Sequence, residues 1–235
     1  MMGSIKLVAV DVDGTLTEST RSLKLSPYSI EAIRLLRSRG YTIVLITGNV
    51  LPIAVGLSIY LGTGGPVVAE NGCIVFYPDT LREVHLCEGR PGVEVVRALE
   101  NLGFKLAWQN RYREHDLAFH VPRGASYKLL EEARRLVEPL GFNVYWSGFA
   151  LHVQPRGGGK DRGVEVILRD LDLTWDNVAA VGDGENDIPM LVKARISATT
   201  SDSPDLVKRV VGYVASKPGG EGFLEFARLL VSLKE

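Results

Sequence analysis

Short apolar runs alternate with longer segments of helical periodicity toward both ends of this 235-residue chain. Residues 5–10, 41–47 and 178–181 are apolar at nearly every position, which is typical of strands buried on both faces of a parallel sheet. Between such runs, apolar residues recur every three to four positions, as in the helix predicted between Ser26 and Gly40. The pattern predicts an α/β fold in which helices cover both faces of a doubly wound parallel sheet.

The middle of the chain follows a different order, which is helix, strand, strand, helix, strand, strand. It also contains an internal repeat, because residues 100–108 resemble residues 138–146, and residues 118–124 resemble residues 151–157. Each copy predicts one helix followed by two strands. Together the copies predict a four-stranded antiparallel sheet with two helices on one face, unless the likeness is a chance recurrence of strand-like segments.

We therefore expect a Rossmann-like catalytic core formed by residues 1–79 and 156–235, with an inserted α+β domain at residues 80–155. Three consecutive glycines at residues 157–159 would form the hinge through which the chain returns to the core.

Composition narrows the protein class. A hydrophobic content of 46% and a charged content of 23% are ordinary for a globular protein, and a net charge of −1 gives no basic surface for nucleic acid. No apolar run reaches membrane-spanning length, and acidic residues stand where a signal peptide would be apolar. Cys73 and Cys87 lack metal-ligand spacing and are too few for a disulfide framework, so we expect reduced thiols in a cytoplasmic protein. A homodimer is left open.

The first apolar run leads into the sequence DVDGTLT at residues 11–17. Asp11 and Asp13 are two residues apart, so along a strand their side chains would point the same way. Two like charges at one place persist when a cation lies between them or when one carboxyl keeps its proton. Both conditions suit phosphoryl transfer, although a strand ending in a simple Asp-Gly turn is the structural alternative.

A second acidic segment, GDGEND at residues 182–187, follows the strand at residues 178–181. Asp183 would lie at the end of that strand, and Asp187 at the start of the next helix. Carboxylates converging at one edge of a parallel sheet form an oxygen-rich site that suits Mg²⁺. Each of these residues alone fits an ordinary turn or helix cap.

Two weaker signals accompany the acidic residues. Thr47 and Gly48 end another predicted strand and offer a hydroxyl and backbone N–H groups for phosphate oxygens, although such a pair is usually only a turn. Lys160 follows the three glycines and precedes a helix, which gives it a flexible approach to the carboxylates, although most lysines are solvated.

In combination these segments resemble the motifs of the haloacid dehalogenase (HAD) superfamily phosphatases, in order, in spacing and over the whole chain. The matching positions are residues 11–17, Thr47, Lys160 and residues 182–187. The insert resembles the α/β cap of one subfamily, and its short two-copy form is similar to the archaeal phosphoglycolate phosphatases, more than to the larger-capped sugar phosphatases. The turn at residues 70–72 also resembles a family turn near the active site, but a plain turn fits equally well.

The resemblance implies a role for each matching residue. Asp11 would be the nucleophile and a metal ligand. Asp13 would be the general acid/base and a ligand through its backbone carbonyl. Asp183 would be a metal ligand, and Asp187 a ligand or a partner of the ligands. Phosphate would be bound by Thr47, Gly48, Lys160 and Asn186.

The expected activity is Mg²⁺-dependent hydrolysis of a small phosphate ester through an aspartyl-phosphate. By resemblance, 2-phosphoglycolate is the leading substrate, and glycolate and phosphate are its products. A sugar-phosphate phosphatase and a phosphomutase of the same superfamily are the alternatives. The intact carboxylates and Lys160 argue against a non-enzymatic phosphate-binding module.

Substrate selection would fall to the insert. A substrate carboxylate would need a cation or N–H donors, and an arginine of the insert, Arg111 or Arg113, or the hinge residue Arg156 would supply it, although a solvated loop is the simpler expectation for the first two. His120 and His152 occupy equivalent places in the repeat, and we expect them to pack within the sheet of the insert.

Overall fold

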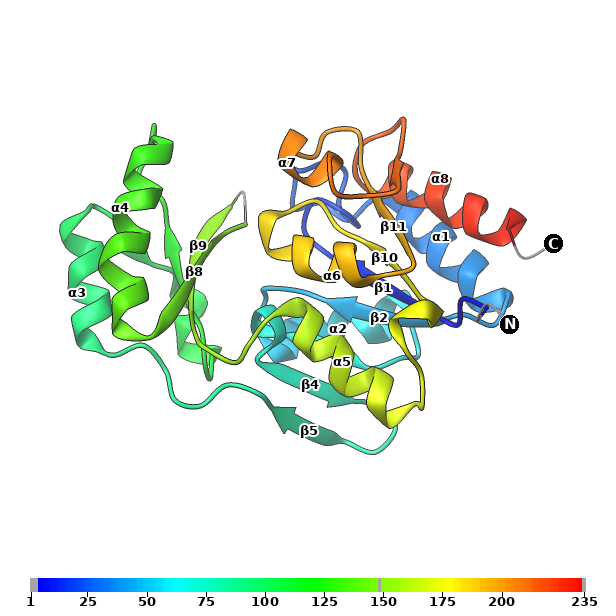
Figure 1. The fold of residues 1–235 in the computed structure, drawn as a ribbon, viewed down its shortest axis with the longest axis horizontal. Coiled ribbons are helices and arrows are strands. Elements are labelled where there is room, and N and C mark those ends of the chain that lie inside the picture. Colours follow the sequence, from blue (N-terminus) through cyan, green and yellow to red (C-terminus); the bar gives the residue numbers. More distant parts are fainter. Residues whose placement is uncertain (1–3, 148, 234–235) are drawn as a thin grey trace.

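The computed structural model describes residues 4–147 and 149–233. Figure 1 shows a large core that contains both ends of the chain and a smaller insert that two linkers join to the core. An eight-stranded sheet forms the centre of the core. Its strands are β1 (Leu7–Asp11), β2 (Thr42–Ile46), β3 (Val67–Ala69), β4 (Ile74–Tyr77), β5 (Arg82–His85), β10 (Val178–Val181), β11 (Ile196–Thr199) and β12 (Tyr213–Val214).

The sheet has the order β12-β11-β10-β1-β2-β3-β4-β5, and it is parallel from β12 to β3. Strand β1 lies between β2 and β10, with Val10 aligned to both Leu45 and Val181. The carboxyl ends of these three strands therefore meet at one edge of the sheet. That edge is where ligands bind in open α/β folds.

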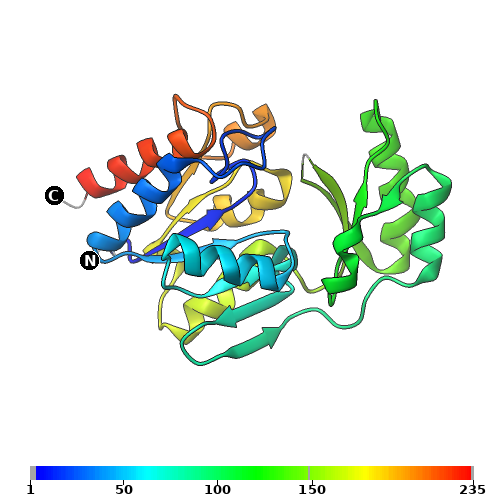
Figure 2. The ribbon, with the colours of Figure 1, turned by 180° about the vertical axis from the view of Figure 1, so that it is seen from behind.

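Helices cover both faces of this sheet, as the apolar strands predicted. Side chains of β1 alternate between the two sides, so that Val8 and Val10 pack in one apolar cluster while Leu7 and Ala9 pack in the other. Helices α1, α2 and α8 lie in front of the sheet in Figure 2, and α5 and α6 lie in front of it in Figure 1. None of the helices in the described part of the chain combines the length and apolar character needed to cross a bilayer. The core helices are α1 (Pro27–Ser38), α2 (Leu51–Leu61), α5 (Lys160–Asp170), α6 (Ile188–Lys193), α7 (Asp205–Lys208) and α8 (Gly219–Ser232).

The insert has the predicted order of elements. These are α3 (Val93–Asn101), β6 (Lys105–Leu106), β7 (Leu117–His120), α4 (Tyr127–Val137), β8 (Phe142–Trp146) and β9 (Ala150–Pro155). Its strands form an antiparallel sheet of order β6-β7-β9-β8, so the second strands of the two copies pair at its centre. Leu99, Phe119 and Val153 lie in the apolar cluster between this sheet and its two helices. Short 3₁₀ helices complete the chain at η1 (Glu70–Gly72), η2 (Trp108–Tyr112), η3 (Glu138–Leu140), η4 (Trp175–Asn177) and η5 (Glu185–Asp187).

The large sheet continues further along the chain than the sequence indicated. Strand β5 pairs antiparallel with β4, although it lies within the range where the insert was expected. The division of the chain into core and insert stays a prediction, and the strand pairing favours a start of the insert after β5.

The expectation of reduced thiols is wrong for this structure, because Cys73 and Cys87 form a disulfide with a Cα–Cα distance of 5.0 Å. The two cysteines stand at the open end of the antiparallel β4–β5 hairpin, where the backbone N–H of Leu86 donates to the carbonyl of Cys73 at 2.8 Å. Hairpin pairing thus brings together two residues that are 14 positions apart. The number of cysteines in a sequence does not predict a single disulfide that strand pairing brings about.

The two linkers pass side by side at this disulfide. A Cβ atom on Gly158 would lie 2.7 Å from Sγ of Cys87 and 2.9 Å from Sγ of Cys73, so this position has room for glycine alone. A Cβ atom on Gly157, where φ is +112°, would lie 3.0 Å from the carbonyl oxygen of Leu86. The chain therefore leaves the core and returns to it at nearly the same point.

Candidate active site

The loops after β1 and β10 interlock at the carboxyl edge of the sheet. Asp11 is the last residue of β1, and Gly14 turns the chain with φ of +90°, a conformation that favours glycine. A Cβ atom on Gly14 would lie 2.6 Å from Oδ1 of Asp183, so the carboxylate packs directly on the glycine backbone. The hydroxyl of Thr15 donates to the same oxygen at 3.2 Å. The glycine thus allows the two acidic loops to approach each other.

Three predicted carboxylates lie close together, and one ammonium group contacts two of them. Oxygens of Asp11, Asp183 and Asp187 lie within 4.8 Å of one another, and all three residues are buried. Lys160, the first residue of α5, donates from Nζ to Oδ1 of Asp11 at 2.5 Å and to Oδ1 of Asp187 at 2.7 Å. Its side chain is only 3% exposed. Negative charge exceeds positive charge in this buried group.

The pKa values record that excess. Burial raises the pKa of Asp11 to about 7, and the neighbouring carboxylate of Asp187 adds to the rise. Burial and the carboxylate of Asp11 also raise the pKa of Asp183 well above its usual value. Burial alone would lower the pKa of Lys160, but Asp11 and Asp187 more than offset it and hold that pKa above its usual value. The raised pKa values mean that the positive charge near Asp11 and Asp183 is too small to stabilise both carboxyl groups in their ionised form.

These residues fit a hard divalent cation, because an extra positive charge would neutralise carboxylates that burial otherwise destabilises. Asp11 and Asp183 are the candidates to hold it. Asp187 is more heavily engaged, since its Oδ1 accepts from Lys160 while its Oδ2 accepts from the backbone N–H of Asp183 at 3.1 Å and of Gly184 at 2.8 Å. Its contacts favour the role of a partner that positions the other ligands.

Asp13 lies next to this group without belonging to it. Its carboxylate accepts a hydrogen bond from Nδ2 of Asn49 at 2.8 Å, and it lines the same cavity as Asp11. Burial raises the pKa of Asp13, although Lys160 and His152 act in the opposite direction. A carboxyl group with a raised pKa beside the first aspartate suits proton transfer.

Besides Lys160 on α5, the residues predicted to bind phosphate lie in the loops after β2 and β10, and the second of these loops contacts the turn at Asn71. Gly48 and Asn186 line the cavity, and Nδ2 of Asn186 donates to Oδ1 of Asn71 at 2.9 Å. Thr47 is fully buried, and its hydroxyl oxygen accepts from the backbone N–H of Asn49 at 3.0 Å. This hydrogen bond stabilises the conformation of the loop at residues 47–49. Asn49 and Asn71 were not among the predicted site residues. The sequence alone does not distinguish an asparagine that contacts a site from one that only forms a turn.

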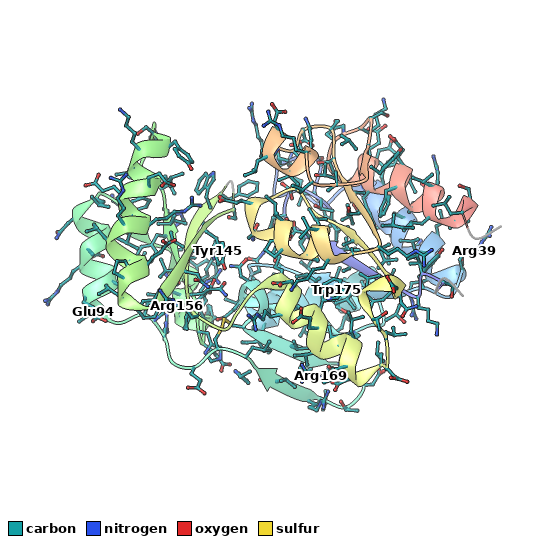
Figure 3. The ribbon with its side chains drawn as sticks, viewed as in Figure 1. Arg39, Glu94, Tyr145, Arg156, Arg169 and Trp175 are labelled. Atoms are coloured by element: carbon teal, nitrogen blue, oxygen red, sulfur yellow. A yellow bond between two sulfur atoms is a disulfide. The ribbon has the colours of Figure 1, made fainter. Side chains whose placement is uncertain are left out.

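A cavity of about 360 Å³ lies between these core loops and the insert. Figure 3 shows side chains from both parts entering the space between them. The insert contributes residues that the core motifs do not predict. Among the lining residues of the insert are Gln109, Arg113, Ser147, Phe149 and His152.

The turn Glu70–Gly72 docks the insert on the core. The buried carboxylate of Glu70 accepts hydrogen bonds from three successive backbone N–H groups, those of Glu114 at 2.9 Å, His115 at 2.8 Å and Asp116 at 3.0 Å. Asn71 donates from Nδ2 to Oδ2 of Asp116 at 3.2 Å. This turn is therefore more than a plain chain reversal, which settles the alternative that the sequence left open.

Arg113 and His152 are both held by Asp116. Arg113 is buried, forms an ion pair with Asp116, and donates from Nη1 to the carbonyl oxygen of Gly48 at 2.9 Å. Nδ1 of His152 lies 2.9 Å from Oδ2 of Asp116. Burial would raise the pKa of Asp116, but Arg113 and His152 outweigh it and hold that pKa below its usual range. The expectation of a solvated loop is wrong for Arg113, because the loop is pressed against the core.

The other basic candidates lie away from the cavity. Arg111 is exposed, with its guanidinium 5.9 Å from the ring centre of Tyr112. Arg156, labelled in Figure 3, is exposed and donates to the carbonyl oxygen of Glu138 at the end of α4. His120 is exposed although its repeat partner is buried. Position in the repeat therefore did not predict which histidine meets the site.

A family model described as haloacid dehalogenase-like hydrolase matches residues 8–110 and 116–226. The chain is 44% identical over 225 residues to a phosphoglycolate phosphatase of Aeropyrum pernix, an alignment that covers 96% of this chain and 93% of that protein. It is 38% identical to phosphoglycolate phosphatase 1 of Saccharolobus solfataricus, over 97% of this chain and 96% of the relative.

Solved structures share the fold over nearly the full length. A crystal structure from Thermoplasma acidophilum superposes with a TM-score of 0.84 at 29% identity, and covers 97% of this chain and 99% of that chain. A sugar phosphatase of HAD subclass IIB superposes with a TM-score of 0.73 at 18% identity, and covers 97% of this chain and 98% of that chain. The second likeness concerns the fold alone.

Proposed function

Since this chain belongs to the haloacid dehalogenase-like hydrolases, we propose that it is a Mg²⁺-dependent phosphatase that hydrolyses 2-phosphoglycolate to glycolate and phosphate. The observation that carries the proposal is the ammonium group of Lys160 between the carboxylates of Asp11 and Asp187, beside a cavity that Asp13 also lines. The names of the relatives at 44% and 38% identity support the choice of substrate.

In the first step, a carboxylate oxygen of Asp11 attacks the phosphorus atom of the ester. The bond between phosphorus and the ester oxygen breaks, and the phosphoryl group stays on Asp11 as an aspartyl-phosphate. The leaving oxygen takes a proton from Asp13, whose pKa is raised above its usual value by burial. Lys160 offsets the repulsion between the attacking carboxylate and the anionic phosphate.

In the second step, a water molecule attacks the phosphorus of the aspartyl-phosphate and gives its proton to Asp13. Phosphate leaves, and the carboxylate of Asp11 is restored. Splitting the hydrolysis in this way replaces one difficult displacement by two easier ones. Asn49, which donates to Asp13 at 2.8 Å, fixes the side chain that serves both steps.

Mg²⁺ would be held by Asp11 and Asp183, with Asp187 in support and Asp13 contributing through its backbone carbonyl as the family likeness implies. When bound, the ion supplies charge neutralisation and orientation for the phosphate. The residues of the chain provide the nucleophile, the proton carrier and the ammonium group.

The test is phosphate release by the purified protein from a panel of phosphomonoesters, in parallel with Asp11→Asn. We expect 2-phosphoglycolate to give the highest kcat/KM. The asparagine variant should lose turnover, because an amide is a poor nucleophile, and should keep its fold. Mass spectrometry after rapid acid quench should detect a phosphoryl adduct on the wild-type chain that is missing from the variant. Asp170→Asn, which alters a surface carboxylate on α5, is the matched control and should behave as wild type.

Near-normal activity in a folded Asp11→Asn protein would remove Asp11 as nucleophile. A higher kcat/KM for hexose phosphates would overturn the substrate and favour a sugar phosphatase. Activation by a bisphosphorylated sugar would instead indicate a phosphomutase. The cytoplasmic location stays a prediction, and the disulfide removes the support that it drew from unpaired cysteines.

A further inference from the structure

We propose that Arg113 selects the substrate by binding its carboxylate through the Nε and Nη2 edge of the guanidinium group. The inference rests on the proposed function, since it assigns the part of the site that distinguishes 2-phosphoglycolate from phosphate esters without a carboxylate.

The hydrogen bonds of Arg113 are distributed unevenly over its guanidinium group. Nη1 has two partners in the protein, the carbonyl oxygen of Gly48 and the carboxylate of Asp116. Among the residues that the structure describes, nothing accepts a hydrogen bond from Nε or Nη2. The side chain is completely buried, and buried polar groups in native proteins are normally hydrogen-bonded. A buried cation with one whole edge unsatisfied implies an acceptor that the protein chain itself does not supply.

The shape of that edge indicates the kind of acceptor. The N–H of Nε and one N–H of Nη2 run parallel, which is the arrangement that holds both oxygens of a carboxylate at once. Arg113 lines the same cavity as Asp11, Asp13 and Lys160. A planar anion bound there would share that cavity with the reacting groups.

The position of Arg113 also fits the short length of 2-phosphoglycolate, in which one methylene group separates the ester oxygen from the carboxylate. Gly48 belongs to the loop predicted to bind phosphate, and its carbonyl oxygen is the atom that Arg113 contacts at 2.9 Å. One residue therefore joins the phosphate loop to the guanidinium. Lys160 is already engaged by Asp11 and Asp187, so it is not available for a second anionic group.

Two contacts with the core hold the arginine in place. Asp116 pairs with Arg113 and is itself bound by His152 and Asn71. Glu70 fixes the backbone of the same loop through three N–H groups. The recognition edge is thus set by residues of both the insert and the core, and Asp116 and Glu70 act as positioning residues.

The test compares 2-phosphoglycolate with ethyl phosphate, which has a methyl group in place of the carboxylate. Arg113→Lys keeps the charge and loses the parallel pair of donors. We expect its kcat/KM for 2-phosphoglycolate to fall by at least about 30-fold, the lower bound for truncating one partner of a buried charge pair. Its kcat/KM for ethyl phosphate should fall by a smaller factor, because ethyl phosphate has no carboxylate to lose and only the contact of Arg113 with the Gly48 carbonyl changes.

Arg111→Lys is the matched control, because it makes the same exchange two residues away on an exposed side chain. We expect both of its kcat/KM values to stay within about twofold of wild type, as for a surface substitution. Arg113→Gln should follow Arg113→Lys with a larger loss of preference, and thermal unfolding of each variant should show that it is folded.

Equal losses on both substrates in the Arg113 variants would mean that Arg113 has a structural role only, and unchanged preference would mean that it does not meet the carboxylate. Either result overturns the inference while 2-phosphoglycolate hydrolysis stands. A wild-type enzyme that treats the two substrates alike overturns it even when no Arg113 variant folds. Failure to hydrolyse any phosphomonoester would instead overturn the proposed function.

Discussion

Replacing Lys160 with methionine would remove the ammonium group from the carboxylate cluster and keep a side chain of similar size. Lys160 is 3% exposed and holds Asp11 and Asp187 at 2.5 and 2.7 Å, so the change leaves buried carboxylates without their protein cation. Removing one partner of a buried ion pair destabilises a protein by about 3–5 kcal/mol. That loss is a large fraction of the roughly 5–15 kcal/mol that stabilises a typical folded protein.

The loss of unfolding free energy caused by Lys160→Met should depend on pH in a defined direction. The pKa of Asp11 is about 7 in the folded wild type, against 3.8 for an ordinary aspartate, so its folded form keeps a proton that the unfolded chain has released. The contribution of Asp11 to stability therefore falls as pH rises from about 4 to 7. Without Lys160 the pKa of Asp11 rises further, which extends that fall above pH 7. The destabilisation caused by Lys160→Met should be larger at pH 8 than at pH 5, where Asp11 is protonated in both proteins.

The measurement is urea unfolding in EDTA at pH 5 and pH 8, with the midpoint and slope fitted separately. Lys193→Met is the matched control. Lys193 also contacts two carboxylates, those of Asp161 and Glu165, but its side chain is 37% exposed. Solvent-exposed ion pairs contribute up to about 1 kcal/mol to the free energy of unfolding. A loss below about 1 kcal/mol for Lys160→Met at pH 8, or an equal loss at both pH values, would refute the description of a buried and unbalanced cluster.

Other substitutions test the remaining parts of the site. Asp13→Asn should lower kcat on an alkyl phosphate by roughly 10²–10⁴-fold with little change in phosphate affinity, and a loss below tenfold would count against its proton-transfer role. Asp183→Ala should raise the Mg²⁺ concentration needed for half-maximal activity, because an oxygen ligand is lost, while full activity of the wild type in metal-free buffer would contradict the metal site. Replacing residues 88–157 with a short Gly/Ser linker should abolish the preference among phosphomonoesters and spare some hydrolysis of p-nitrophenyl phosphate. An unchanged ranking of substrates in that protein would place specificity in the core.

The catalytic cluster was predictable because its signals are local. Asp11 ends one apolar strand and Asp183 lies two residues after another, and a parallel sheet brings the ends of such strands to one edge. Lys160 stands at the start of a helix that enters the same edge. Strand periodicity and three short motifs were therefore enough to place most of these groups. Their chemical roles stay predictions.

The cavity wall formed by the insert was not predictable in the same way. Whether Arg113 is solvated or buried depends on Glu70 and Gly48, which lie more than 40 residues away in the sequence and reach it through tertiary contacts. A polar loop with alternating charges has the same local pattern in either case. The disulfide was missed for a related reason, since the β4–β5 pairing that aligns Cys73 and Cys87 includes a strand expected to belong to the insert.

The side-by-side linkers at Gly158 and Cys87 bear on the order in which the chain folds. Closing an unstructured loop over residues 88–157 would cost roughly 4 kcal/mol in chain entropy through its length alone. An insert that folds first brings its own two ends together. The core then forms around a short connection and not around a long unstructured loop. Strand β10, which follows the insert in the sequence, must pair with β1, which precedes it. We therefore expect early formation of the insert to accelerate assembly of the central sheet, with the two-copy unit acting as an internal folding nucleus.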